Sequence, residues 1–241
     1  MSAAIWHDVE CGAYVADLEL WRALAQAHGG PVLDVGAGTG RVALDLAGHG
    51  HDVVALDLDP ELLAALTARA AAAGLSVPVH EADARSFDLG GARFPLVLVP
   101  MQTVQLLGGA AGRAGFLAAL RAHLAPGGIA AIALADALEA FDVEHDAPPL
   151  PDIREIDGVV YSSLPVSVED RGAAGTALHR VRETVQRDGT HASEQNTIVL
   201  DALDAATLED EARAAGLTVG RRLAIPATEE YVGSAVVVLG A

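Results

Sequence analysis

The chain alternates between short apolar runs and longer segments in which apolar residues recur every three or four positions. The short runs predict buried strands at Pro31–Val35, Asp52–Leu58, Val77–Glu81, Leu96–Val99 and Ile129–Leu134. The longer period predicts helices at Ala13–His28, Arg41–Gly48, Glu61–Ala73 and Arg113–Leu124. Strands that alternate with helices in this way indicate βαβ units and a parallel sheet.

The pattern changes after about residue 140. A strand is expected at Val159–Val166, and the segments on either side of Asp188-Gly189, Ala177–Arg187 and Thr190–Leu200, predict a β-hairpin. The α/β pattern then returns with a helix at Asp204–Ala215 and strands at Leu217–Ala224 and Ser234–Leu239. We therefore expect a doubly wound α/β domain whose mostly parallel, seven-stranded sheet is interrupted by an inserted antiparallel β cap. Residues 1–140 and 204–241 would form the α/β core, and residues 141–203 would form the cap.

Composition narrows the classes of partner. The 241 residues carry 15 basic and 33 acidic side chains, a formal net charge of −18, which disfavours nucleic acids and anionic membranes. The sequence contains no lysine, which excludes Schiff-base chemistry, pyridoxal phosphate anchoring and the P-loop. The single cysteine, Cys11, fits a reducing compartment, and the acids near the N-terminus do not resemble a signal peptide. We expect a cytoplasmic protein without membrane spans; the sequence leaves its oligomeric state open.

A glycine loop follows the first predicted strand, in the segment Val32–Gly40 (VLDVGAGTG). Asp57 ends the next strand, about 20 residues later, where an acid meets ribose hydroxyls in nucleotide-binding α/β folds. Arg41 occupies the place of the last glycine of the dinucleotide fingerprint, and Asp34 would repel a pyrophosphate but suit a cation. These residues favour S-adenosylmethionine (SAM) over NAD. In the alternative interpretation, the loop is only a tight turn and Asp57 caps the helix that begins at Pro60.

Several motifs in order resemble the class I, Rossmann-like SAM-dependent methyltransferases. They are the glycine motif, the segment Gly50–Leu63 (GHDVVALDLDPELL), Glu81–Arg85 (EADAR) and Leu124–Gly128 (LAPGG). The resemblance implies that Asp34 and the loop hold the methionine end of SAM, that Asp57 binds the ribose, and that Pro100, Met101 and Gln102 border the transferred methyl group. It also implies adenine contacts and a lid helix before the first strand, with the acceptor near the cap. The implied cofactor-binding residues are Tyr14, Asp34, Gly36, Ala37, Gly38, Gly40, Asp57, Leu58, Asp83, Ala84, Pro100, Met101 and Gln102.

Side chains for acid–base or metal chemistry are sparse. His145 is the best candidate for a general base, because it follows the fifth strand on the expected ligand side. The acidic segment Asp142–Asp146 contains metal-ligand types but is read as a solvated loop, so no metal site is expected. Arg180 and Arg182 on the hairpin would favour an acceptor with a carboxylate or phosphate if they faced the crevice.

The sequence thus predicts a SAM-dependent methyltransferase that acts on a nitrogen or oxygen of a small molecule by direct displacement. The alternatives are an NAD(P)-dependent oxidoreductase on a related fold and a non-catalytic SAM-binding protein. Tyr14 and Trp21 are candidates for a lid over the cofactor, although an apolar stripe of this kind is more often core.

Overall fold

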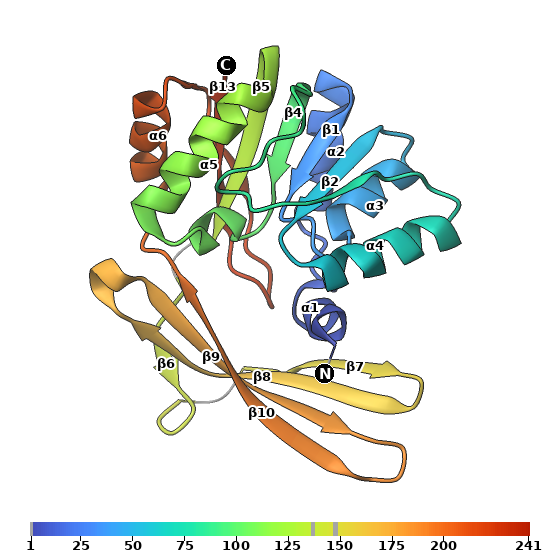
Figure 1. Cartoon of the computed structure of the whole chain (residues 1–241). Coiled ribbons are helices and arrows are strands. Elements are labelled where there is room, and N and C mark those ends of the chain that lie inside the picture. The colour runs from blue at the N-terminus through green and yellow to red at the C-terminus, as the bar shows by residue number, and fades with distance from the viewer. Residues whose placement is uncertain (1, 136–137, 147–148) are drawn as a thin grey trace. The chain divides into compact units, whose positions relative to one another are not determined.

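The computed structural model describes residues 2–135, 138–146 and 149–241. The chain forms two compact units (Figure 1). The first, here called the antiparallel unit, comprises Met1–Ala13 and Ala137–Ala202, and the second, the α/β unit, comprises Tyr14–Asp136 and Leu203–Ala241. The sequence-based division assigns residues 1–13 to the α/β core instead. In the structure, helix α1 (Ala3–Cys11) contacts strands of the antiparallel unit, so this segment groups with that unit.

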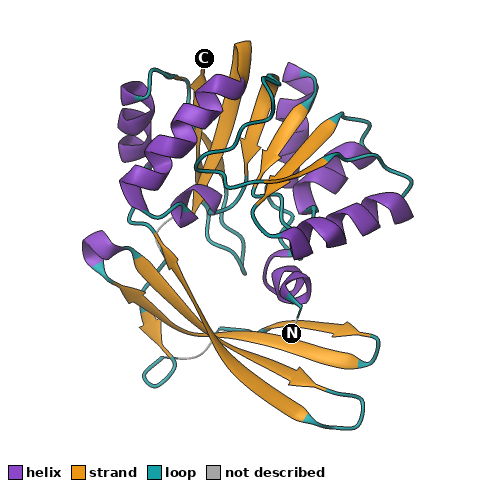
Figure 2. Ribbon diagram, viewed as in Figure 1, coloured by secondary structure: helices purple, strands orange, loops and turns teal. Residues whose placement is uncertain are grey.

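The α/β unit is built on one eight-stranded sheet (Figure 2). Its strands run in the order β11-β13-β5-β4-β1-β2-β3, and β12 also pairs with β13. Strands β1 to β5 pair in parallel, whereas β13 is antiparallel to β5, β11 and β12. The strand bounds are β1 Val32–Val35, β2 Val53–Asp57, β3 Val79–Glu81, β4 Phe94–Val99, β5 Leu124–Ala135, β11 Thr218–Val219, β12 Leu223–Ile225 and β13 Ser234–Gly240. The expected doubly wound, mostly parallel sheet is confirmed, but it has eight strands where seven were expected.

Helices cover both faces of this sheet (Figure 1). Alternate residues of β1 point to opposite faces: Leu33 and Val35 join a core with α5 and α6, and Val32 joins a core with α2, α3 and α4. The helix bounds are α2 Leu18–His28, α3 Arg41–Gly48, α4 Pro60–Ala72, the 3₁₀ helix η1 Thr103–Leu106, α5 Gly109–His123 and α6 Ala205–Ala214. The carboxyl ends of the parallel strands, where α/β folds bind ligands, therefore lie between two well-packed layers.

Two expected elements are interrupted. The helix expected at Ala13–His28 begins only at Leu18, because the Asp17 side chain accepts a hydrogen bond from the indole of Trp21 and pairs with Arg41. The strand expected at Leu217–Ala224 is two short strands, β11 and β12. Between them, the Gly220 N–H still donates to the Val238 carbonyl at 2.8 Å, so the edge remains attached to β13.

The antiparallel unit is a five-stranded sheet with the order β10-β9-β8-β6, in which β7 also pairs with β8. The bounds are β6 Phe141–Asp142, β7 Asp152–Ile156, β8 Val159–Asp170, the 3₁₀ helix η2 Gly172–Ala174, β9 Thr176–Val185 and β10 His191–Leu200. The expected hairpin is present as β9 and β10, in a register that pairs Val185 with His191. Helix α1 packs on this sheet, with the Trp6 ring edge-on to Tyr161 at a centroid distance of 5.6 Å.

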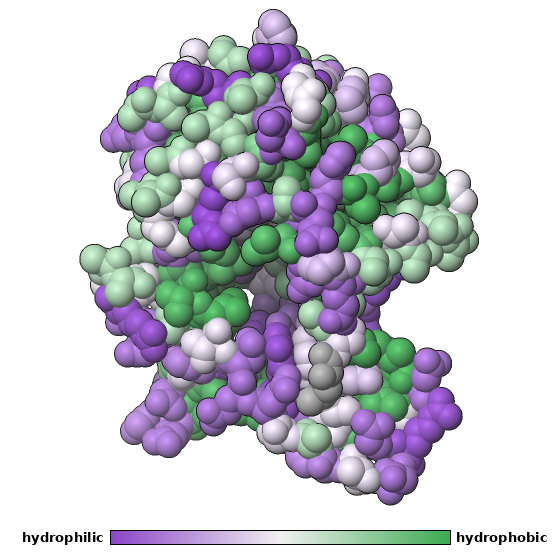
Figure 3. Space-filling model, in the orientation of Figure 1, coloured by the Kyte–Doolittle hydropathy of each residue, from purple (hydrophilic) through white to green (hydrophobic). Residues whose placement is uncertain are grey.

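Hydrophilic and hydrophobic residues are interspersed over the visible face of both units (Figure 3). Within the described ranges, no helix is both long and apolar enough to cross a membrane.

Candidate functional site

The glycine loop after β1 wraps over the tip of β2. The Gly36 and Ala37 N–H groups donate to the Leu56 carbonyl at 2.8 and 3.0 Å. Gly36 has φ +72°, and a Cβ there would lie 2.5 Å from the Thr103 side chain. Gly40 has φ +95° and precedes α3 directly. Glycine is therefore required for both backbone conformation and close approach, as expected where a ligand must come near the main chain.

Asp57 at the end of β2 ties the loop to the strand. Its carboxylate accepts hydrogen bonds from Gly38 N at 2.8 Å and from Asp59 N at 2.9 Å. The cap of α4 is Asp59, whose side chain accepts from Glu61 N at 2.8 Å. The alternative role of Asp57 as a helix cap is thus taken by its neighbour, and the Asp57 side chain stays half-buried beside the loop.

Asp34 is the most unusual group of the site. It is 1% exposed, and neither carboxylate oxygen has a hydrogen-bond partner of ordinary geometry. Burial raises the pKa of this carboxyl to about 7, and the nearby Arg41 guanidinium and the backbone N–H of Ala43 oppose the rise. A buried carboxylate without such a partner is costly, and a cation would offset that cost.

Arg41 joins the start of α3 to the segment before α2. Its guanidinium contacts both carboxylate oxygens of Asp17, at 2.5 and 2.7 Å, and donates to the Tyr14 carbonyl at 2.9 Å. It also lies 5.1 Å from the centroid of the Tyr14 ring. Trp21 is fully buried and donates its indole N–H to Asp17 at 2.7 Å, so it is a core residue and not a lid.

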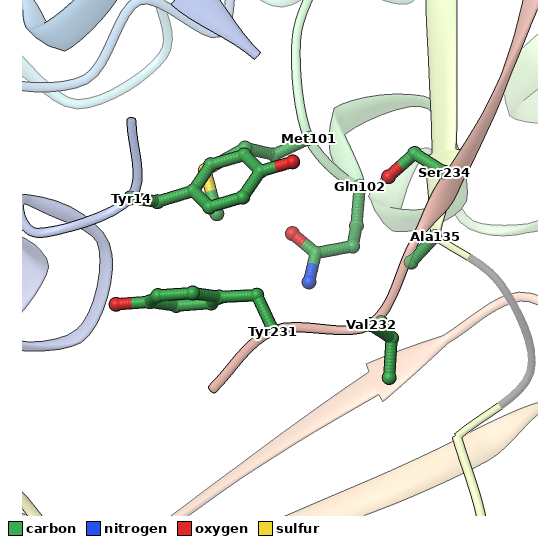
Figure 4. A pocket seen from close by; sticks show the side chains of 7 residues that line it. All are labelled: Tyr14, Met101, Gln102, Ala135, Tyr231, Val232 and Ser234. Atoms are coloured by element: carbon green, nitrogen blue, oxygen red, sulfur yellow. The ribbon is translucent and has the colours of Figure 1, made fainter. Parts of the chain in front are cut away.

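A pocket opens in the α/β unit beside these residues (Figure 4). Tyr14 and Tyr231 form an aromatic pair with ring centroids 4.9 Å apart. The Tyr14 hydroxyl is directed toward Ser234, and the Gln102 amide lies between the tyrosines and Ser234 (Figure 4). Burial raises the pKa of the Tyr14 hydroxyl above its ordinary value, so it is neutral at physiological pH. The lining residues, all without formal charge, are Tyr14, Met101, Gln102, Ala135, Tyr231, Val232 and Ser234.

The turn after β4 supplies two of these residues. Met101 has φ +54°, a left-handed conformation that side-chain-bearing residues rarely adopt and that clusters at functional sites. Gln105, one turn further on, is buried and accepts a hydrogen bond from the Ala135 N–H at 2.9 Å. The strained turn and the end of β5 are thus fixed to each other at the pocket.

The three residues implied as adenine contacts follow β2 and β3. Leu58 is 62% exposed, a large apolar surface at the strand end. Asp83 and Ala84 are half-buried. The Asp83 carboxylate is engaged by Arg85 through its backbone N–H and guanidinium, and these hydrogen bonds hold the pKa of Asp83 below its usual range.

The other candidates lie in the antiparallel unit. His145 is exposed in the turn after β6, where its backbone N–H donates to the Asp142 carbonyl at 2.9 Å. Arg182 is bidentate to Glu10 of α1, at 2.7 and 2.9 Å, and Arg180 pairs with Asp152 at 2.9 Å. Both arginines thus form ion pairs within the antiparallel unit, and a contact of either with an acidic acceptor stays a prediction. Among the described residues, no group of three His, Cys, Asp or Glu side chains is arranged to hold a metal ion.

Sequence reasoning missed Tyr231, Ser234 and the structural role of Arg41. Tyr231 precedes β13 in a chain with only three tyrosines, which was an available signal. Its pairing with Tyr14, more than 200 positions earlier, could not be read from spacing.

Comparison with known proteins agrees with the resemblance to methyltransferases that the motifs indicate. Residues 32–128 match the family model described as a methyltransferase domain. The uncharacterized protein Rv1403c of Mycobacterium tuberculosis is 47% identical over 71 residues, which cover 30% of this chain and 26% of that relative. The chain therefore matches about a quarter of the length of this curated relative.

Solved structures share the fold over almost the whole chain. The sugar N-methyltransferase KedS8 from Streptoalloteichus has a TM-score of 0.71 at 22% identity, covering 97% of this chain and 90% of that one. SAM-bound CalS10, an amino pentose methyltransferase from Micromonospora echinaspora, has a TM-score of 0.65 at 25% identity, covering 96% and 91%. These findings confirm the resemblance drawn from the motifs and support the expected cofactor. Residues 32–128 of the α/β unit therefore match a methyltransferase domain, and the chain shares the fold of solved SAM-dependent methyltransferases.

Proposed function

We propose that this protein transfers a methyl group from SAM to an amino group of a small, hydroxyl-rich acceptor such as an amino sugar. The observation that carries the cofactor assignment is the Asp34 carboxylate at the start of the glycine loop, which is buried and lacks a hydrogen-bond partner of ordinary geometry. SAM carries an ammonium and a sulfonium group and no phosphate, so it fits a site that offers a carboxylate without lysines.

The residues around Asp34 suit the remaining parts of SAM. The carboxylate of Asp57 would accept hydrogen bonds from the ribose hydroxyls while it keeps its bond to Gly38 N. The exposed side chain of Leu58 would pack on the adenine, with Asp83 and Ala84 contacting its edge. The remaining implied residues, Gly36–Gly40 at the methionine end and Pro100–Gln102 at the methyl group, keep those roles in the proposal.

Both the pocket and the structurally similar enzymes support a sugar-like acceptor. Tyr14, Gln102 and Ser234 offer hydroxyl and amide groups, which suit the hydroxyls of a sugar. KedS8 is described as a sugar N-methyltransferase and CalS10 as an amino pentose methyltransferase, which supports the same class of acceptor here.

For methyl transfer from SAM, the protein needs mainly to align the amine with the methyl group and to exclude water. When bound, SAM supplies an activated methyl group on a positively charged sulfur. The amine lone pair forms the new C–N bond as the C–S bond breaks, and the amine then loses a proton to solvent. The uncharged pocket wall favours the neutral amine that this step needs, and Tyr14, neutral at physiological pH, would orient it. A role of His145 as general base stays a prediction.

The test begins with calorimetric titration of SAM, S-adenosylhomocysteine (SAH) and NAD into the purified protein. We expect micromolar binding of SAM and SAH and no binding of NAD. Binding of NAD without binding of SAM or SAH would favour the alternative of an NAD(P)-dependent oxidoreductase. Asp57→Ala should weaken SAM binding roughly 10- to 100-fold, since a charge-assisted hydrogen bond contributes about 1.5–3 kcal/mol. Asp52→Ala, an exposed acid before β2, is the matched control and should change nothing.

The acceptor is tested by mass spectrometry with SAM and matched panels of amino sugars and the corresponding neutral sugars. A gain of one methyl group confined to the amino sugars would support N-methylation. Methylation of the neutral sugars would refute the amine assignment. SAM binding with no transfer to either panel would favour the non-catalytic SAM-binding alternative.

A further inference from the structure

The carboxylate of Asp83 is held by one residue two positions further along the chain. The Arg85 backbone N–H donates to Oδ1 at 2.9 Å, and its Nε lies 2.9 Å from Oδ1 and 3.0 Å from Oδ2. Nη2 donates to Oδ2 at 2.6 Å. This fork fixes the plane of the carboxylate, which a single contact or a lysine could not do.

Arg85 is itself fixed against helix α5. A Cβ added to Gly115 would lie 2.5 Å from the Arg85 carbonyl oxygen, and one added to Gly112 would lie 3.2 Å from the Arg85 Cδ. The helix therefore presents a face without side chains, on which the backbone and the stem of Arg85 lie. This contact fixes the backbone and the stem of Arg85, while its side chain stays 51% exposed at the guanidinium end.

The fork occupies only part of the Asp83 carboxylate. Each carboxylate oxygen has two lone pairs, and the Asp83 side chain keeps 30% of its surface exposed. An acceptor held ionised and in a fixed plane selects a partner that presents hydrogen-bond donors. The edge of adenine presents an amino donor beside a ring nitrogen acceptor, whereas hypoxanthine presents a carbonyl acceptor beside a ring N–H donor.

We propose that Arg85 is a positioning residue that fixes the Asp83 carboxylate as an acceptor for the adenine amino group and so makes the cofactor site selective for adenine over hypoxanthine. The proposal rests on the proposed use of SAM. In this assignment Asp83 accepts from the amino group and the Ala84 N–H donates to the ring nitrogen. Hypoxanthine reverses both groups, so it places an acceptor against the carboxylate.

The test compares binding of SAH and S-inosylhomocysteine, its deaminated analogue, by calorimetry. The wild-type protein should prefer SAH by at least about tenfold, the effect of one well-placed hydrogen bond. Arg85→Met should weaken SAH binding about tenfold and change binding of the inosine analogue less than about threefold, so that the preference is lost. Arg85→Lys should recover only part of it, because the ammonium lacks the fork.

Arg22→Met is the matched control. Two guanidinium nitrogens of Arg22 likewise donate to a carboxylate, that of Asp45, but this pair joins helices α2 and α3. It should leave both affinities unchanged. An unchanged preference in Arg85→Met would overturn the proposal, and so would an equal loss of affinity for both ligands, which would mean that Arg85 only supports the loop. A wild-type protein that binds neither SAH nor SAM would instead overturn the proposed function.

Discussion

Replacing Arg41 by methionine tests whether the buried ion pair with Asp17 organises the pocket side of the α/β unit. The Arg41 side chain is 11% exposed and the Asp17 side chain is fully buried. Methionine keeps most of the stem but removes the guanidinium, while the Trp21 indole still donates to the Asp17 carboxylate. The change also removes the hydrogen bond to the Tyr14 carbonyl.

The expected magnitude follows from burial. Breaking a buried pair by removing one partner costs about 3–5 kcal/mol, because an uncompensated charge remains inside. In a domain of this size each kcal/mol lowers Tm by about 2–4 °C, so the variant should melt roughly 10 °C lower. The half-buried pair Arg22–Asp45, whose side chains are 39% and 15% exposed, offers a control, for which Arg22→Met should cost less than Arg41→Met because both charges keep more contact with water.

The assay uses the distribution of the two tryptophans. Trp21 lies in the α/β unit and Trp6 in the antiparallel unit, so a Trp6→Phe background lets fluorescence report on the α/β unit alone. Thermal unfolding is then compared for the parent, Arg41→Met, Arg22→Met and the double variant Arg41→Met/Asp17→Asn. The neutral asparagine can still accept from Trp21, so the double variant should recover at least half of the lost stability.

Two results would refute this reasoning. One is a loss in Arg41→Met no larger than that in Arg22→Met, which would mean that the pair contributes no more than a half-buried pair. The other is a double variant as unstable as Arg41→Met, because the cost would then come from lost packing and not from the unpaired charge of Asp17.

Four further predictions concern three residues, Asp34, Gly36 and Glu10. Asp34→Asn should raise the Tm of the ligand-free protein more at pH 8 than at pH 5, because the raised pKa of about 7 means that stability is lost as the pH rises from the ordinary carboxyl pKa to about 7 and stays lost above it; an equal shift would contradict it. SAM affinity should fall as the pH drops below about 7, and calorimetry should find no such fall in Asp34→Asn. Gly36→Ala should abolish SAM binding, since its Cβ would lie 2.5 Å from Thr103, with Gly48→Ala, in open space, as the control. Glu10→Gln should destabilise the antiparallel unit by about 2–4 kcal/mol, because the Arg182 guanidinium loses the Glu10 carboxylate. Unfolding is measured by Trp6 fluorescence in a Trp21→Phe background. No change in stability would mean that the Glu10–Arg182 pair contributes as little as a surface ion pair.

The local pattern of the sequence was enough to predict most of the sheet. Parallel strands buried on both faces read as continuous apolar runs, and Gly36, Gly38 and Asp57 stand at spacings that the backbone itself requires. The hairpin at Asp188-Gly189 is also local, but its register pairs Val185 with His191 and Gln186 with Thr190, so the turn holds three residues, Arg187–Gly189, instead of the two that the Asp-Gly pair predicts. The boundary of α2 was not predictable in this way, since the side chain of Asp17 is held by Arg41 in another element.

Tertiary structure decided the chemistry of individual groups. Asp34 lies near the end of β1 and Asp83 follows β3; the first is buried and the second is held by Arg85, so their pKa values move in opposite directions. The pairing of Tyr14 with Tyr231 joins distant segments, and Arg180 and Arg182 form ion pairs with acids distant in the sequence. Sequence by itself determined most of the elements and the resemblance to the SAM-dependent methyltransferases, because periodicity and glycine spacing act over a few residues. Burial and pairing depend on which distant side chains meet, and only the folded chain fixes that.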